Sequence, residues 1–150
     1  MLDNAKLEDL KQLVEIEESM FEKSKYVALT EKEWLRLLKK NSSKILVWRD
    51  GDTICGYALG IVINKNHIWF NSLAVLKKFQ STPIAKTLFD AIESLAKELE
   101  LKTIILEIRA DNKALFRRYT GFGYKIFKLI ENYYPDGCNA IRMIKKMEAF

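Results

Sequence analysis

The stretch from Ser72 to Leu88 reads SLAVLKKFQSTPIAKTL, and it contains the junction on which the fold depends. An apolar segment ends at Val75, a short polar loop follows, and a helical pattern begins near Ile84. The N-terminus of a helix presents unpaired backbone N–H groups and a partial positive charge, so it is a natural site for an anion. The stretch therefore predicts a strand, an anion-binding turn and a long helix, in that order.

The helix after this junction is the clearest element of the chain. Over 84–99 its apolar residues recur at helical spacing, at Ile84, Leu88, Ala91, Ile92, Leu95 and Leu99, which is typical of a helix that packs on a core. Residues 103–108 follow as a short apolar run of the kind that is buried on both faces of a sheet. A helix between two such strands predicts a parallel pair joined by a right-handed crossover.

The remaining elements are indicated by periodicity and by turn residues. Thr30 and Glu33 form a capping box ahead of a helix, and Asp50-Gly51 is a two-residue hairpin signal. We expect helices at 7–21, from about 31, at 84–99 and at 112–119, and strands at 45–48, 53–63, 67–75, 103–108, 124–130 and 139–147, after a very short first strand. This order predicts an α/β (mixed α+β) fold, with a mixed central sheet and helices on both faces. The sequence has no linker or repeat, so residues 1–150 are expected to form one domain.

Composition limits the class of protein. The chain has 150 residues, a formal net charge of +5 and two cysteines. Its first residues show no apolar signal region, and no apolar run approaches the ~20 residues of a membrane span, so we expect a reduced, cytoplasmic protein that binds no membrane. On charge alone a polyanionic cofactor and nucleic acid are equally suitable partners. The lysines are scattered among acidic residues and no aromatic-rich motif is present, so nucleic-acid binding is the weakest of the interpretations.

A second group of residues lies around the strand at 103–108. It comprises Leu106-Glu107-Ile108-Arg109, Asn112, Tyr119, Gly123-Tyr124 and, near the end, Asn132-Tyr133-Tyr134-Pro135. Together with Gln80 and Ala85, this pattern resembles the GNAT superfamily of N-acetyltransferases, most closely the bacterial ribosomal-protein N-terminal alanine acetyltransferases. The resemblance covers residues 68–147 by motif and residues 1–67 by element order. Pro83 stands where the family has a central glycine.

The resemblance implies a GNAT-type fold whose sheet is split between two parallel strands, 67–75 and 103–108, with coenzyme A in the split and no metal. It implies that the cofactor is held by Leu73, Ala74, Val75, Gln80, Ser81, Thr82, Pro83, Ile84, Ala85, Lys86 and Asn112. It also implies that Glu107 accepts the proton of the attacking amine, directly or through water, and that Tyr119 donates a proton to the leaving thiolate. Tyr133 and Tyr134 would then help to hold a substrate peptide.

Each of these residues also has a structural interpretation. Glu107 can be a strand-end carboxylate, Tyr119 a half-buried aromatic, Asn112 a helix cap, and the pair Tyr133-Tyr134 packing residues of an edge strand. Thr82 and Pro83 form a good helix start, with Thr82 as N-cap and Pro83 at the first helical position.

The resemblance predicts transfer of an acetyl group from acetyl-CoA to a protein N-terminal α-amine. A small-molecule amine is the close alternative, and Pro83 keeps open a family member that binds acyl-CoA or a partner protein without turnover. The acceptor, the acyl chain and the choice between monomer and homodimer stay open at this point.

Overall fold

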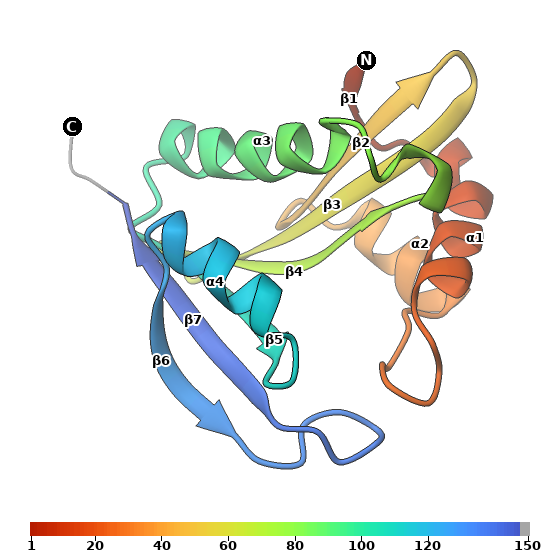
Figure 1. Ribbon diagram of the computed structural model, residues 1–150. Coiled ribbons are helices and arrows are strands. Elements are labelled where there is room, and N and C mark those ends of the chain that lie inside the picture. Colours follow the sequence, from red (N-terminus) through yellow and green to blue (C-terminus); the bar gives the residue numbers. More distant parts are fainter. Residues whose placement is uncertain (148–150) are drawn as a thin grey trace.

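The computed structural model describes residues 1–147, and its centre is a seven-stranded sheet in the order β1-β2-β3-β4-β5-β7-β6 (Figure 1). The strands are β1 (Leu2–Asn4), β2 (Ser43–Asp50), β3 (Thr53–Ile63), β4 (His67–Val75), β5 (Thr103–Arg109), β6 (Lys125–Ile130) and β7 (Ala140–Lys146). Among the described residues, β4 and β5 pair in parallel and all other neighbours pair antiparallel. The predicted mixed sheet is therefore confirmed. The last three residues of the predicted domain lie outside the described residues.

Helices cover both faces of the sheet, as predicted (Figure 1). They are the 3-10 turns η1 (Leu7–Asp9) and η2 (Lys77–Phe79) and the helices α1 (Leu10–Met20), α2 (Glu31–Lys39), α3 (Ile84–Glu98) and α4 (Lys113–Gly121). Apolar residues of α1 and α2 form one core with the sheet, and those of α3 and α4 form the other. The predicted capping box at the start of α2 is present, because Thr30 Oγ1 accepts the N–H of Glu33 at 3.2 Å.

Several predicted bounds differ from the structure by one or two residues, and three of these differences, at a turn, a helix end and a helix cap, have a clear physical reason. The hairpin turn is Gly51-Asp52, because Asp50 still pairs with Thr53 and Gly51 takes the left-handed φ of 62°. Helix α4 continues beyond Tyr119 to Gly121, since the left-handed residue that ends this region is Gly123, with φ 96°.

The third difference concerns the start of α3. Pro83, not Thr82, is the N-cap, and its carbonyl accepts the N–H of Thr87 at 2.9 Å. Thr82 is drawn into the preceding turn instead, because its backbone N–H and its hydroxyl both donate to the carbonyl of Phe79. Thr82 Oγ1 also lies 3.4 Å from the N–H of Ile84, too far for a strong cap.

The sheet opens between its two parallel strands. β4 and β5 pair only over His67–Trp69 and Thr103–Ile105, after which β4 stays with β3 and β5 with β7. The register of β3 and β4 shifts by one residue at Asn71, and such a bulge bends the strand that carries it. The predicted split between the two parallel strands is thus present, and both arms are held in place by their outer neighbours.

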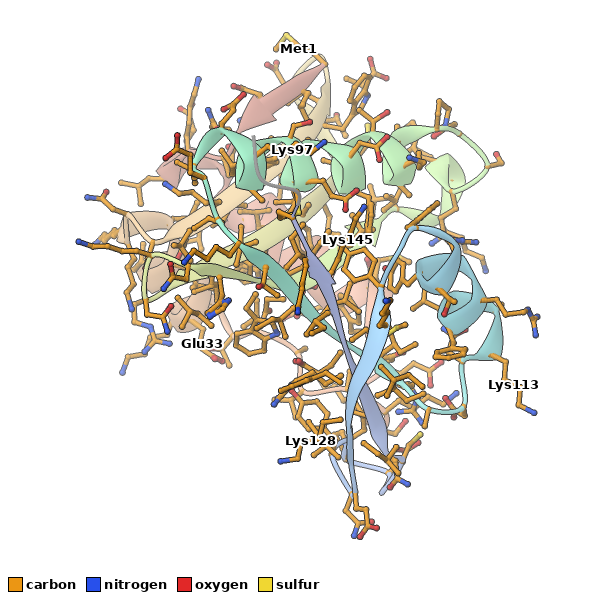
Figure 2. All side chains as sticks on the ribbon, turned by 90° about the vertical axis from the view of Figure 1, so that its left-hand side faces the viewer. Met1, Glu33, Lys97, Lys113, Lys128 and Lys145 are labelled. Carbon is orange, nitrogen blue, oxygen red and sulfur yellow. The ribbon has the colours of Figure 1, made fainter. Side chains whose placement is uncertain are left out.

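Charged side chains are distributed over the whole molecule. Figure 2 shows Lys97, Lys113, Lys128 and Lys145 on four different elements, α3, α4, β6 and β7. Lys145 is paired with Glu93 of α3 at 3.0 Å. At the other edge of the sheet, Arg49 pairs with Asp3 and Asp9. In the described part of the chain, no helix has the length and apolar character needed to span a membrane.

Candidate active site

A cavity of about 470 Å³ occupies the opening between β4 and β5. Its walls come from β4 (Trp69–Leu73), β5 (Leu106–Arg109), α1, the segment after α1, α4 and the loop between β6 and β7. Of the predicted site residues, it brings together Leu73, Glu107, Asn112, Tyr119, Tyr133 and Tyr134. The loop residues before α3, 80–83, do not line this cavity. They follow the end of β4 at Val75.

The β4 arm directs backbone N–H groups into the opening. Leu76 donates its N–H to the carbonyl of Cys55 on β3 at 2.9 Å, and opposite residues of an antiparallel ladder alternate between bonded and non-bonded pairs. Counted back along the β3–β4 register, the N–H groups of Leu73 and Val75 point away from β3, whereas that of Ala74 points toward β3. Leu73 and Val75 are therefore the two predicted strand residues whose N–H groups are available to a ligand.

The loop from Gln80 to Pro83 connects this arm to α3, and its side chains are used to build the turn. Gln80 donates from its side-chain amide to the carbonyl of Val75 at 3.0 Å, which fixes the loop to the end of β4. Pro83 has no N–H, and the N–H of Thr82 is bonded to Phe79. The turn thus leaves fewer donors for an anion than a glycine-containing loop would.

The first turn of α3 supplies the remaining donors. Within residues 1–147, the N–H groups of Ala85 and Lys86 have no backbone or side-chain acceptor, as is usual for the start of a helix. The N–H of Ile84 has only the long contact with Thr82, and the ammonium of Lys86 is paired with Asp90 at 2.6 Å on the surface. This turn is a suitable site for a phosphate.

Glu107 lies on β5, two residues past the end of the β4–β5 ladder, with a side chain that is 7% exposed. Its Oε1 accepts the indole N–H of Trp69 at 2.8 Å, and its Oε2 accepts from Nε of Arg142 at 2.9 Å. The hydroxyl of Tyr133 is 3.5 Å from Oε1, at the limit of a hydrogen bond. These donors, which come from three separate segments, fix the orientation of the carboxylate at the cavity wall.

Tyr119 faces the same cavity from α4. It is buried, and its ring stacks on Phe89 of α3 with 5.3 Å between ring centroids. Burial raises the pKa of its hydroxyl above the ordinary value of 10, partly opposed by the charge of Arg118. Tyr119 is therefore a phenol at neutral pH, which can donate a proton or a hydrogen bond.

One predicted structural role, the helix cap at Asn112, is present beside the predicted site, whereas Tyr133 and Tyr134 lie in a loop and not in an edge strand. Asn112 is the N-cap of α4, and its Oδ1 accepts the N–H of Leu115 at 3.1 Å. Tyr133 and Tyr134 contact each other edge to face in the loop between β6 and β7, and Tyr134 also contacts Tyr26. Asn112 and both tyrosines also line the cavity, so a cap or a packing contact does not remove them from the site.

A buried carboxylate on the cavity wall was missed by the sequence interpretation. Glu17 of α1 accepts the N–H of Leu29 at 2.8 Å and the hydroxyl of Tyr57, which also bonds Ser72 Oγ at 2.8 Å. Burial raises the pKa of Glu17 above 4.5, opposed in part by the hydrogen bonds from Leu29 and Tyr57. The signal was available, since Glu17 occupies an inward position of a helix whose other buried residues are apolar.

The described residues contain no group of three or more His, Cys, Asp or Glu side chains that could hold a metal ion. The single histidine, His67, stands at the start of β4 with its Nδ1 buried, at the end of the strand away from the cavity. The cavity itself is lined by carboxylates and tyrosines, among them Glu17, Glu107 and Tyr119.

A model of the acetyltransferase (GNAT) family matches residues 8–124, which is most of the chain. The chain belongs to this family. A solved structure, Ard1 from Thermoplasma volcanium, shares the fold with a TM-score of 0.86 at 24% identity, over 99% of this chain and 98% of that one. The split sheet of this GNAT protein is thus the fold of its family, and the predicted family is confirmed.

Two curated relatives indicate which part of the family this GNAT protein resembles. It is 28% identical over 138 residues to the putative [ribosomal protein bS18]-alanine N-acetyltransferase of Bacillus subtilis, covering 89% of this chain and 85% of that one. It is 30% identical over 87 residues to the N-alpha-acetyltransferase of Saccharolobus solfataricus, covering 57% and 51%. The chain spans about half to three-fifths of the length of several curated relatives that it matches.

Proposed function

We propose that this protein transfers an acetyl group from acetyl-CoA to the N-terminal α-amine of a protein, by direct attack of the amine on the thioester. The observation that carries the proposal is one cavity, at the split of the sheet, that holds Glu107, Tyr119 and the Leu73 end of β4 together. These are the groups that acyl transfer to an amine requires: a proton acceptor, a proton donor and a donor to the carbonyl oxygen.

The residues of the two arms fit acetyl-CoA. The outward N–H groups of Leu73 and Val75 suit the thioester and amide carbonyls of the cofactor, and the N–H groups of Ala85 and Lys86 suit its pyrophosphate. Asn112 stands across the opening on the β5 side. When bound, acetyl-CoA supplies an activated acetyl group, so no covalent enzyme intermediate and no metal are needed.

The protein's own groups divide the chemistry between the two arms. An ammonium cannot attack a carbonyl, so Glu107, whose orientation is fixed by Trp69 and Arg142, accepts a proton from the incoming amine or from a water next to it. The N–H of Leu73 stabilises negative charge that develops on the carbonyl oxygen. Tyr119, held protonated by burial, donates to the departing sulfur.

A protein N-terminus is favoured as acceptor because the side of the cavity next to Glu107 is built from loops with aromatic side chains. Tyr26, Tyr133 and Tyr134 line it, and the Tyr133 hydroxyl approaches Glu107 itself. One of the curated relatives above is named as an N-alpha-acetyltransferase and the other as a putative [ribosomal protein bS18]-alanine N-acetyltransferase, which supports the same choice. We place the protein in the cytoplasm, in keeping with two unpaired cysteines, Cys55 and Cys138.

The decisive experiment is acetyl-CoA turnover against a panel of N-terminal peptides and small amines, combined with calorimetric titration of acetyl-CoA. We expect acetyl-CoA to bind and a peptide to have the highest kcat/KM. If a small amine is fastest, the acceptor part of the proposal is wrong. Binding of acetyl-CoA without turnover on any amine would instead identify a family member that binds acyl-CoA only.

A further inference from the structure

Arg109 is the last residue of β5, two positions after Glu107, and its side chain is 6% exposed. Its Nη1 donates to the carbonyl of Lys25 at 2.8 Å, in the segment between α1 and α2. Its Nη2 donates to Asp136 at 2.5 Å, in the loop between β6 and β7. Nε and Nη2 also bond Asp111, just after β5, at 3.1 and 3.2 Å. One buried guanidinium therefore joins three segments that are far apart in the sequence.

Aromatic contacts reinforce the same junction. The Arg109 guanidinium carbon lies 5.4 Å from the ring centroid of Tyr26 and 5.0 Å from that of Tyr134. The two rings also contact each other edge to face, with 5.5 Å between centroids. Figure 1 shows the connection between α1 and α2 and the loop between β6 and β7 beside each other at the lower edge of the molecule. Arg109 is the charged centre of this contact.

The joined segments form the wall of the cavity next to Glu107. Tyr26 and Tyr134 line the cavity, and Tyr133, adjacent to Tyr134, reaches Glu107 Oε1. The cofactor-side elements from Leu73 to Ala85 are on the opposite arm of the split and make no contact with Arg109 among the polar and aromatic interactions of the described residues. Asn112, on the β5 side, bonds the backbone carbonyl of Arg109 at 3.0 Å, a contact that a change of the Arg109 side chain leaves in place. A change of the Arg109 side chain should thus affect binding on the side of the cavity next to Glu107 and not on the cofactor side.

We infer that Arg109 is a positioning residue for the acceptor: it fixes the segments 21–29 and 131–139 against each other and thereby sets where the acceptor amine meets Glu107. The inference rests on the proposed N-acetyltransferase function, and it adds a specific residue that controls acceptor binding but not cofactor binding. The side chain acts through Tyr26, Tyr133 and Tyr134 and has no part in the chemical step.

An arginine is needed here because one planar group must reach three segments at once. A lysine keeps the charge, but its single ammonium cannot reproduce the forked bonds to Asp111 and Asp136 or the flat contact with the rings. Arg109→Lys therefore removes the contacts that connect the three segments, while it leaves a cation of similar length. The molecule also offers a matched control, since Arg49 makes a comparable forked ion pair with Asp3 and Asp9 at the opposite edge of the sheet.

The test compares Arg109→Lys with Arg49→Lys in steady-state kinetics on the best peptide acceptor and in titration with acetyl-CoA. We expect Arg109→Lys to raise KM for the peptide by about tenfold or more, because small errors in positioning are costly, while its dissociation constant for acetyl-CoA stays within twofold of wild type. Arg49→Lys should leave both values unchanged. An unchanged peptide KM in Arg109→Lys, or an equal rise in both variants, would overturn the inference.

Hydrogen exchange of the apo protein gives a second readout that needs no turnover. In Arg109→Lys, amides of both segments, 21–29 and 131–139, should exchange faster, and in Arg49→Lys they should not. If the wild type acetylates no amine, the proposed function fails, and this exchange pattern still decides whether Arg109 joins the two segments. Unchanged exchange rates in both segments would show that Arg109 does not hold them together.

A milder variant covers the case in which Arg109→Lys does not fold. Asp136→Asn leaves the guanidinium in place and weakens one of its bonds, from a loop residue that is a third exposed. We expect the same pattern with a smaller rise in peptide KM, about threefold. If Asp136→Asn instead weakens acetyl-CoA binding and spares the peptide KM, the inference is wrong.

Discussion

Trp69 donates its indole N–H to Oε1 of Glu107 at 2.8 Å, across the split of the sheet. The backbone ladder between β4 and β5 ends at the pair Trp69–Ile105, so this side-chain bond continues the connection where the ladder stops. Glu107 is therefore tied to both arms, by Trp69 on β4 and by Arg142 on β7. A carboxylate oriented in this way can hold an amine, or a water beside it, in a constant position.

The first prediction concerns Glu107→Gln. The amide keeps the shape of the side chain but cannot accept a proton, so we expect kcat on the best acceptor to fall by ~10²–10⁴-fold. Acetyl-CoA binding should not change, because Glu107 lies on the acceptor side of the cavity. Glu93→Gln is a suitable control, since Glu93 also pairs with a cation and a tyrosine but lies outside the cavity. A wild-type rate in Glu107→Gln would remove Glu107 from proton transfer.

The second prediction concerns Tyr119→Phe, which should slow turnover by ~10²–10⁴-fold while the cofactor still binds. The matched control is Tyr124→Phe, because Tyr124 belongs to the same aromatic cluster but its hydroxyl bonds Glu93 and does not line the cavity. If only Tyr119→Phe is slow and Glu107→Gln is not, the proton acceptor is a water chain or another residue. Equal effects in both tyrosine variants would indicate a packing role.

The raised pKa of the Tyr119 hydroxyl also predicts how kcat depends on pH. Because burial raises the pKa of its hydroxyl above 10, the donor form persists throughout the neutral and mildly alkaline range. We therefore expect no alkaline loss of kcat from Tyr119 below about pH 9, measured with a saturating peptide. A descending limb below pH 9 that disappears in Tyr119→Phe would contradict this environment for the hydroxyl.

The fourth prediction links Glu17 to stability. Its pKa in the folded protein is above its ordinary value of 4.5, so the native state binds more protons than the unfolded state between those two values. The free energy of unfolding then falls as the pH rises from about 4.5 through the folded pKa. Glu17→Gln removes this dependence and should gain stability relative to wild type as the pH rises.

Urea unfolding at several values between pH 4.5 and pH 8 tests this point. The difference in free energy of unfolding between Glu17→Gln and wild type should move in favour of the variant with rising pH, and Glu18→Gln, an exposed neighbour on the same helix, should show no such trend. A trend of the opposite sign would mean that the bonds from Leu29 and Tyr57 outweigh burial.

The parts of the fold that sequence predicts best are those bounded by local signals. β3 and β4 match their predicted limits, 53–63 and 67–75, because turns that Gly51 and Asn64-Lys65-Asn66 form delimit them. The predicted helix start at Ile84 was right, but its N-cap was placed one residue too early, because the cap preference of Thr82 competes with a 3-10 turn that takes both its N–H and its hydroxyl. The preference of threonine for N-cap positions does not take account of a competing turn before the helix.

The candidate site was predicted from residues whose spacing along the chain resembles the motif of the family. The contacts that those residues make in the folded protein, which this spacing does not encode, were missed. Glu107 and Tyr119 were found as members of a motif, and the structure places them on one cavity. Trp69 and Arg142, the partners of Glu107, belong to β4 and β7, and their approach depends on the strand register, in which Glu107 stands opposite Arg142. Arg109 was visible as a motif residue, but its contacts with two distant loops depend on the tertiary fold.

The last prediction concerns Pro83, which stands in the proposed phosphate-binding loop at a position where the family resemblance places a glycine. Pro83 is the N-cap of α3 with φ −77° and ψ 10°, and it has no N–H to offer. Pro83→Gly adds one donor next to the free N–H groups of Ala85 and Lys86. A hydrogen bond to a charged oxygen contributes about 1–3 kcal/mol, so acetyl-CoA should bind at least ~5-fold more tightly to the variant. The melting temperature of the apo protein should fall slightly, because glycine is more flexible in the unfolded chain.

Pro83→Ala separates the added donor from the added flexibility. It supplies the same N–H without glycine's freedom, and the φ of −77° suits alanine as well as proline. We expect both variants to tighten acetyl-CoA binding in calorimetric titration, with the larger loss of stability in Pro83→Gly. Tighter binding in the glycine variant alone would show that the loop must change its dihedral angles to meet the phosphate. A dissociation constant that is unchanged or higher in both variants would mean that the N–H groups of Ile84, Ala85 and Lys86 already satisfy the pyrophosphate. The missing N–H of Pro83 would then not weaken the binding of acetyl-CoA.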